Sequence, residues 1–239
     1  MIKILQVRNI DSFVESRRQK TSDKDIHTVL AILDDVRKNG DSAVKKYEQK
    51  FNGRKTSQLR VSEKEIKEAR SKISRDEGDA LWLMKSNLSL QETGLGMYLE
   101  DFANMWASEP WGMTQTMKSL VPIPSVGCYI PGGQARYPSS VIMSVIPAKI
   151  AGVKRIVVVS PPGRDGKVDP LTIVAAKMCG ATEIYKAGGA QAIGALAYGT
   201  KSMPKVDKIV GPGGKFVSIA KSLVSDQTSI DMIAGPTEL

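Results

Sequence analysis

Turns rich in glycine and proline recur in the second half of the 239-residue sequence, and their composition suits anion binding. They fall at 131–133 (PGG), 160–162 (SPP), 188–189 (GG), 211–214 (GPGG) and 235–236 (GP). Glycine lets backbone N–H groups approach a ligand closely, and the N-terminus of a following helix offers unpaired N–H groups to phosphate. Tight turns that merely connect strands to helices have the same composition. At this point the turns can therefore be either anion-binding turns or simple connections.

Side chains that commonly carry acid–base or metal chemistry are scarce. His27 is the only histidine, so a His-based zinc site or a Ser–His–Asp centre would have to rest on it. It falls in the first turn of an expected polar-faced helix, and we interpret it as an ordinary helix residue rather than a metal ligand or a catalytic base. Two cysteines do not make a disulfide framework. We expect Cys128 and Cys179 to be reduced, buried and structural.

The familiar nucleotide-binding motifs are absent from the sequence. The pattern G-x-G-x-x-G begins at Gly211 and Gly213, but Phe216 stands where the third glycine belongs. Gly214-Lys215 has neither the upstream glycine nor the following Ser or Thr of a phosphate loop. A dinucleotide site in this chain must therefore depend on other residues.

The elements that would position these turns alternate regularly after residue 121. Apolar runs expected to be strands alternate with helices, and each strand ends in Gly or Pro. The strands are expected at 126–130, 155–159, 182–185, 206–210 and 230–233, with helices from 139 (kinked or restarted at Pro147), at 170–178, at 190–197 and at 215–224. This alternation predicts an α/β fold with a parallel Rossmann-like sheet and helices on both faces. The carboxyl ends of parallel strands share one edge, so five such turns favour an anionic ligand, most simply a nucleotide.

The first half has helical patterning instead. Helices are expected at 26–36 (closed by Gly40), 41–53, 62–73 (opened by the capping box at Ser62 and Glu65) and 76–106, where Gly94 and Gly96 leave the boundaries open. Trp82, Trp106 and Trp111 are interpreted as packing residues. We therefore predict a mainly helical segment over 1–120, a Rossmann-like domain over 121–233, and a return toward the first segment over 234–239.

Composition excludes several classes of protein. A hydrophobic share of 41% is too high for a disordered chain, and no segment has the apolar length of a membrane span or the pattern of a signal peptide. We expect a cytoplasmic protein with no membrane partner. The net charge is +9, and residues 121–239 carry 13 basic against 7 acidic residues. The lysines are dispersed and lack interleaved aromatics, which favours a small anion over nucleic acid.

Four segments of the chain resemble histidinol dehydrogenase, in order and at sensible spacing. They are 126–153 (VGCYIPGGQARYPSSVIMSVIPAKIAGV), 187–200 (AGGAQAIGALAYGT), 206–217 (VDKIVGPGGKFV) and 231–239 (DMIAGPTEL). The helical pair in DIHTVLAILDDVRKNGDSAVKKYEQKFNG also resembles the family's N-terminal part. The resemblance covers nearly the whole chain but only the first part of the family's sequence.

The resemblance implies an NAD-dependent, zinc-containing enzyme that oxidises L-histidinol to L-histidine in two steps, as an intertwined homodimer. It places Tyr129 and Gln191 at cofactor-binding positions and Thr237 at a substrate-contacting serine position. Gly214 stands where the family usually has an asparagine, which removes a side-chain amide. Without the family, Tyr129 would read as a core aromatic, Gln191 as a solvent-facing helix residue and Gly214 as a simple turn.

The residues that do the family's chemistry are not in this sequence. The family holds zinc with a glutamine, two histidines and an aspartate, and a Glu–His pair does the acid–base work; all follow the AGP[ST]E segment. The chain given ends at Leu239, so we expect neither zinc ligands nor catalytic residues in it, and no catalysis by this chain alone. It could be a fragment, a truncated gene product or one piece of a split enzyme.

Other functions stay open from the sequence. The chain could be a non-catalytic nucleotide-binding or interaction module, or part of a related dehydrogenase of another small alcohol. Nucleic-acid binding through the basic surplus is the third hypothesis, with weak and strongly salt-dependent retention at most.

Overall fold

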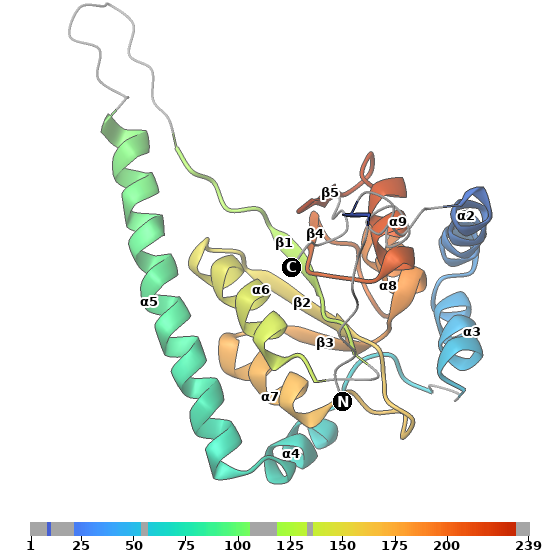
Figure 1. Ribbon diagram of the computed structural model, residues 1–239, viewed down its shortest axis with the longest axis horizontal. Coiled ribbons are helices and arrows are strands. Elements are labelled where there is room, and N and C mark those ends of the chain that lie inside the picture. The colour runs from blue at the N-terminus through green and yellow to red at the C-terminus, as the bar shows by residue number, and fades with distance from the viewer. Residues whose placement is uncertain (1–8, 11–21, 54–56, 106–118, 133–135, 233–239) are drawn as a thin grey trace, which may run out of the picture.

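Five short apolar runs of the second half form a single sheet in which all the strands are parallel. The computed structural model describes residues 9–10, 22–53, 57–105, 119–132 and 136–232. The strands are β1 (Ser125–Tyr129), β2 (Arg155–Ser160), β3 (Glu183–Lys186), β4 (Lys208–Val210) and β5 (Ser229–Ile230), in the order β3-β2-β1-β4-β5 (Figure 1). The predicted fold class is therefore confirmed. The order is that of a doubly wound sheet, and the direction of winding reverses between β1 and β4.

Four helices connect these strands, two on each face of the sheet. They are α6 (Pro138–Ile150), α7 (Pro170–Cys179), α8 (Gly189–Tyr198) and α9 (Lys215–Leu223). Proline at the first position opens α6 and α7, where its missing N–H costs nothing. Helix α6 continues through Pro147 and does not restart there. Figure 1 shows α6 and α7 on one side of the sheet and α8 and α9 on the other.

The helices of the first half form outer layers on both sides of this core. They are α2 (Asp23–Asn39), α3 (Asp41–Asn52), α4 (Glu63–Lys72) and α5 (Arg75–Met105). Helices α2 and α3 pack against α8, whereas α4 packs against α7 and α5 against α6 (Figure 1). Capping boxes at Ser22 and Ser62 start α2 and α4, and Gly40, at φ +51°, ends α2 and begins α3. The helical segment thus covers both faces of the sheet.

Helix α5 runs without interruption for 31 residues, through Gly94 and Gly96. A glycine within a helix costs only about 1 kcal/mol relative to alanine, too little to break a helix that packs along α6. Large apolar side chains remain exposed along α5: Trp82 (61%), Leu90 (79%), Met97 (63%) and Tyr98 (66%). Trp82, interpreted from the sequence as core or edge packing, does not lie in the core, and Trp106 and Trp111 lie outside the described residues.

The sheet separates two apolar clusters. Alternate residues of β2 point to opposite faces, so Val157 and Val159 join the α2, α3, α8 and α9 side while Ile156 and Val158 join the other. Cys128 and Cys179 are free thiols buried in the second cluster, as expected. Burial raises the pKa of Cys128 to about 12 and that of Cys179 to about 11. Both thiols are therefore protonated and unreactive at neutral pH.

Two further sequence expectations concern exposed features. His27 is exposed on α2. In the described part of the chain, none of the helices combines the length and the apolar character needed to cross a bilayer.

A segment before α4 covers the outer edge of β3. The N–H of Val61 donates to the carbonyl of Ile184 (2.8 Å), and the N–H of Lys186 donates to the carbonyl of Leu59 (2.7 Å). The pairing is antiparallel around Arg60. The buried Lys186 ammonium lies 2.9 Å from a carboxylate oxygen of Glu65, which fixes α4 beside the same edge.

Two glycines provide a matched test of packing in this fold. A Cβ on Gly127 of β1 would lie 2.8 Å from a methyl group of Leu196, whereas a Cβ on Gly94 of α5 would meet nothing within 4 Å. We expect Gly127→Ala to lower the free energy of unfolding by about 1–3 kcal/mol through overpacking. Gly94→Ala should raise it by about 0.5–1 kcal/mol. Urea unfolding followed by circular dichroism checks both; equal effects of the two variants would contradict the packing of α8 on β1.

Candidate functional site

Tyr129 ends β1 at the carboxyl edge of the sheet, and its side chain joins this strand to helix α8. Its hydroxyl oxygen accepts a hydrogen bond from the N–H of Gly189 (3.1 Å), and the residue is 5% exposed. Burial raises the pKa of Tyr129, and the nearby Glu48 adds to the rise. The phenol is therefore neutral at physiological pH, and its proton is available for donation.

The start of the loop after β4 lies directly against Tyr129. Gly211 has φ +109°, and a Cβ built on it would lie 2.1 Å from the Tyr129 carbonyl oxygen. No other residue fits there without moving the backbone of β1 or β4. This close contact holds the turn after β1 against the turn after β4, at the point where the winding of the sheet reverses.

A partly buried ion pair holds Gly211 in this position. The Lys221 ammonium, 5% exposed on α9, donates to the carbonyl of Gly211 (3.1 Å) and forms an ion pair with Asp231. The Asp231 carboxylate in turn accepts from the N–H of Gly211 (2.8 Å). Burial pushes the pKa of Asp231 up, but the hydrogen bonds from Lys221 and two backbone N–H groups outweigh it and leave the pKa lowered.

Gln191 lies in the first turn of α8 and is buried rather than facing water. It is 2% exposed, and its Nε2 donates to Oε1 of Glu48 on α3 (2.8 Å). The side-chain carbonyl oxygen of Gln191 is also buried, and no group of the described residues hydrogen-bonds to it. A buried carbonyl without a donor is uncommon in folded proteins and calls for a functional or structural reason.

Gly214 is the N-cap of α9 and is exposed at the same edge. Its φ of −71° and ψ of 178° are open to any residue, and a Cβ there would meet nothing within 4 Å. The backbone therefore does not require glycine at this position. An asparagine would fit without steric conflict.

The structure brings the predicted cofactor residues to one edge of the sheet. Tyr129 ends β1, Gln191 follows β3 and Gly214 follows β4, so all three lie at strand carboxyl ends. Their contacts with a ligand remain predictions, and Thr237 lies outside the described residues. Sequence reasoning missed Glu48, Lys221 and Asp231, because their importance depends on contacts between distant segments that no local pattern encodes.

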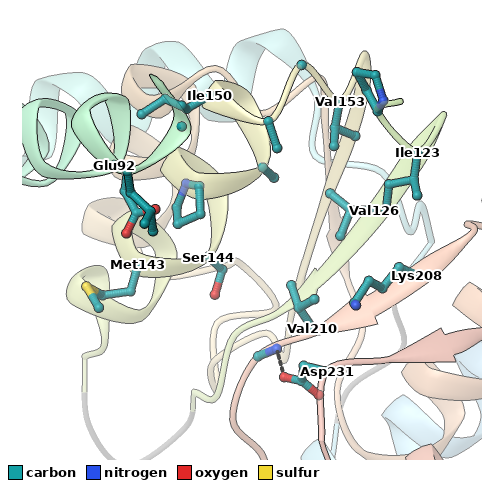
Figure 2. Close-up of a pocket in the computed structure, with 18 of the residues that line it drawn as sticks. Glu92, Ile123, Val126, Met143, Ser144, Ile150, Val153, Lys208, Val210 and Asp231 are labelled. Atoms are coloured by element: carbon teal, nitrogen blue, oxygen red, sulfur yellow. Dashed lines mark hydrogen bonds between the residues drawn. The ribbon is translucent and has the colours of Figure 1, made fainter. Parts of the chain in front are cut away.

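A cavity of about 930 Å³ lies between α5, α6 and the face of β1 and β4 that these helices cover. Figure 2 shows Val126, Val210, Met143 and Ile150 around it, with Lys208 at the start of β4 and Asp231 just after β5. Its lining is mostly apolar. Gly211 and Gly213 reach its rim, but Tyr129 and Gln191 do not line it.

A smaller cavity of about 300 Å³ opens at the carboxyl edge beside the start of α7. Gly132, Ser160 and the cations Arg136 and Lys167 line it. Both cations already have partners: Arg136 binds Glu77 and Asp169, and Lys167 binds Glu68. The cavity is therefore polar but electrically balanced.

No metal site is found among the described residues. They contain no group of three or more His, Cys, Asp or Glu side chains arranged to hold an ion. The zinc that the resemblance implies does not fit this part of the chain, and we derive no chemical step through it.

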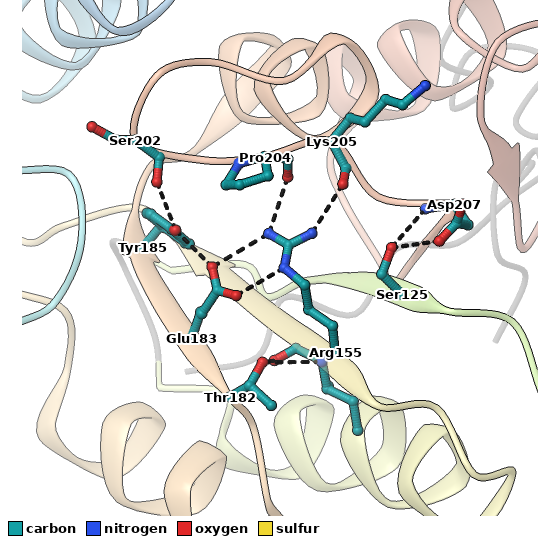
Figure 3. Close-up of polar contacts among 10 residues, drawn as sticks. Ser125, Arg155, Thr182, Glu183, Tyr185, Ser202, Pro204, Lys205 and Asp207 are labelled. Atoms are coloured by element: carbon teal, nitrogen blue, oxygen red, sulfur yellow. Dashed lines mark hydrogen bonds and ion pairs between the residues drawn. The ribbon is translucent and has the colours of Figure 1, made fainter.

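The amino edge of the sheet is closed by a network of hydrogen bonds (Figure 3). The Arg155 guanidinium makes a two-point contact with the Glu183 carboxylate (2.8 and 3.3 Å) and donates to the carbonyls of Pro204 (3.0 Å) and Lys205 (2.9 Å). The Tyr185 hydroxyl lies 2.7 Å from both Glu183 and the Ser202 carbonyl. The network ties β2 and β3 to the connection between α8 and β4.

The fold and the edge described above define a doubly wound α/β protein of the Rossmann-like class. The histidinol dehydrogenase family model matches residues 15–239, and the chain belongs to that family. Histidinol dehydrogenase of Bacillus licheniformis is 44% identical over 97% of this chain and 51% of its own length, and that of Methanothermobacter thermautotrophicus is 44% identical over 97% and 53%. That of Bacillus cereus is 49% identical over 88% and 48%.

The solved structure of histidinol dehydrogenase from Elizabethkingia anophelis is similar to this chain with a TM-score of 0.77 and 33% identity. The match covers 96% of this chain and 52% of that one. The chain thus spans about half the length of the relatives it matches.

The amino-edge network predicts a specific dependence of stability on pH. Burial pushes the pKa of Glu183 up, but hydrogen bonds from Arg155 and Tyr185 leave it below the ordinary 4.5. A carboxyl with a lowered pKa stabilises the fold above its unfolded pKa, and this contribution is lost as the pH falls below about 4.5. Glu183→Gln should cost about 1–3 kcal/mol at pH 7 and should show a smaller loss of stability between pH 6 and pH 3.

The control for this prediction is Glu100→Gln, which alters an exposed carboxyl group on α5. Urea unfolding at each pH measures both variants. If Glu183→Gln and Glu100→Gln had the same pH profile, the network would not contribute to stability.

Proposed function

We propose that this chain supplies the NAD-binding part of a histidinol dehydrogenase, which oxidises L-histidinol to L-histidine. The observation that carries the proposal is the strand order β3-β2-β1-β4-β5 with glycine-rich turns at the carboxyl edge. In sheets of this kind ligands bind outside the carboxyl ends of the strands, where the winding reverses. Tyr129 and Gly211 lie at that point.

Residues at this edge suit a dinucleotide. The Tyr129 hydroxyl has a proton to donate, and the Gln191 carbonyl oxygen is a buried acceptor with no donor among the described residues. The open N-cap at Gly214 leaves the first turn of α9 without a side-chain cap, and such a turn favours negative charge. These residues bind and orient the nucleotide. When bound, NAD supplies the acceptor for the hydride that leaves the alcohol carbon.

The remaining chemistry is assigned to no residue of the described part. Alcohol oxidation needs a base for the hydroxyl proton, and the only histidine, His27, is exposed on α2. The proposed substrate contact of Thr237 stays a prediction. We accordingly propose NAD binding for this chain and the complete oxidation for the whole family enzyme, in the cytoplasm.

A homodimer is the proposed assembly, and the exposed apolar side chains of α5 support it. Monomeric proteins rarely expose large continuous apolar patches, and Trp82, Leu90, Met97 and Tyr98 are all more than 60% exposed. Sedimentation equilibrium of the chain and of a Leu90→Glu variant tests this. A monomer for the unaltered chain at all concentrations would oppose it.

A non-catalytic nucleotide-binding module is the second candidate function. The lack of a metal-ligand cluster in the described residues favours it for the isolated chain. An assay of NAD reduction with L-histidinol, run on the chain joined to the rest of a family enzyme, separates the two. The NAD-binding part of a histidinol dehydrogenase supports turnover in that assembly, whereas the module would bind NAD without turnover.

The proposed function predicts that NAD binds to the chain at the carboxyl edge. Calorimetry with NAD should give a dissociation constant in the millimolar range or below. Hydrogen exchange should slow at 129–132, 188–191 and 211–216 and stay unchanged in α5. No binding at millimolar NAD, or protection confined to another region, would overturn the proposal.

Gly214 offers a gain-of-function test of the same site. Gly214→Asn restores the amide that the family usually has and meets no steric conflict, so NAD should bind several-fold more tightly, the worth of about one hydrogen bond at ~1 kcal/mol. Gly214→Ala is the matched control, since it adds a Cβ without an amide and should leave affinity within about twofold. Equal effects of both substitutions would rule out an amide contact.

A further inference from the structure

Glu48 is a fully buried carboxylate that reaches from α3 to the start of α8. It is 0% exposed, and its Oε1 accepts from the N–H of Gly188 (2.7 Å) and from Nε2 of Gln191 (2.8 Å). A carboxyl group is costly to bury unless it is hydrogen-bonded. Helix α3 therefore places an acidic side chain at the helix N-terminus where a ligand anion would otherwise bind.

This contact fixes the orientation of the Gln191 amide. Oε1 of Glu48 takes the N–H of Gly188, so it acts as an acceptor, and the atom of Gln191 that faces it must be the donor Nε2. The carbonyl oxygen of Gln191 is thereby turned toward Gly189, where a Cβ would lie 2.9 Å from it. It stays buried, with no donor among the described residues.

We propose that Glu48 is a positioning residue, which acts through Gln191, and that this end of α8 receives an uncharged hydrogen-bond donor of the nucleotide, a hydroxyl or amino group, rather than a phosphate. The inference rests on the proposed function. Two of the N–H groups at the start of α8 already have acceptors: that of Gly188 donates to Glu48 and that of Gly189 donates to the Tyr129 hydroxyl. A phosphate here would meet a carboxylate and a carbonyl oxygen, whereas a donor would satisfy the carbonyl.

The matched control lies on the same helix. Asp41, at the start of α3, accepts from the hydroxyls of Thr200 and Ser202 beyond the other end of α8. Asp41→Ala therefore weakens the docking of α3 on α8 without touching Gln191. Glu48→Gln is the conservative variant, because one amide oxygen can still accept from both Gly188 and Gln191.

The first experiment needs no nucleotide. NMR measures the exchange of the Gln191 side-chain amide protons in the whole chain, where we expect protection of about tenfold or more. Glu48→Ala should abolish this protection, and Glu48→Gln and Asp41→Ala should keep it. If Glu48→Ala does not fold, Glu48→Asp, which withdraws the carboxyl by one methylene, should show the same loss. Unchanged protection in the folded Ala or Asp variant overturns the positioning role.

The second experiment is a double-mutant cycle on NAD affinity. Glu48→Ala and Gln191→Ala should each weaken NAD binding about tenfold, as expected for one lost hydrogen bond to a buried group. The double variant should be no weaker than Gln191→Ala, since Glu48 acts through Gln191. Additive losses would indicate a separate structural role and overturn the inference. Asp41→Ala should leave the affinity within about twofold.

The third measurement tests the chemical class of the bound group. NAD should shift the NMR signal of the Gln191 side-chain amide. Inorganic pyrophosphate at about 10 mM, a concentration high enough to fill a weak anion site, should leave this signal unchanged. A shift with pyrophosphate alone would show that a phosphate binds there. If the unaltered chain bound no NAD, the proposed function would fail, while the exchange experiment would still decide the role of Glu48.

Discussion

The common direction of the five strands is the constraint on which the candidate site depends. Parallel strands need crossover connections, so every turn from strand to helix lies at one edge and every return at the other. Tyr129, Gln191 and Gly214, which lie 62 and 23 residues apart along the chain, meet at that edge for this reason alone. The close approach of Gly211 to the Tyr129 carbonyl then holds the turns after β1 and β4 against each other.

The two edges of the sheet are built from different chemistry. At the amino edge, Arg155 uses its guanidinium to join a carboxylate and two backbone carbonyls, so that donors and acceptors are matched within the protein. At the carboxyl edge, glycines replace side chains and the Gln191 carbonyl has no donor among the described residues. The amino edge maintains the fold, and the carboxyl edge holds a buried acceptor whose hydrogen-bonding capacity the described residues do not use. Glu48 links these roles, because a residue of an outer helix orients a group at the available edge.

Local patterns predicted much of this structure. Some signals involve only a few neighbouring residues: the capping box at Ser62, Gly40 at the end of a helix, and the apolar runs that end in glycine. The helices and strands that these signals predict are present at those positions. The order of strands and the contact of Glu48 with Gln191, 143 residues apart, depend on tertiary packing that no short pattern contains. The continuity of α5 was likewise missed, since packing against α6 outweighs the weak helix propensity of Gly94 and Gly96.

The segment over Leu59–Val61 has a consequence for how the protein behaves at high concentration. Strands at the border of a sheet present unpaired N–H and carbonyl groups that can template the addition of a foreign strand, a common start of aggregation. Here the backbone of Leu59 and Val61 already occupies that border at β3, and at the opposite border β5 is only two residues long. Within the described part of the chain, the sheet therefore offers little template for intermolecular strand pairing.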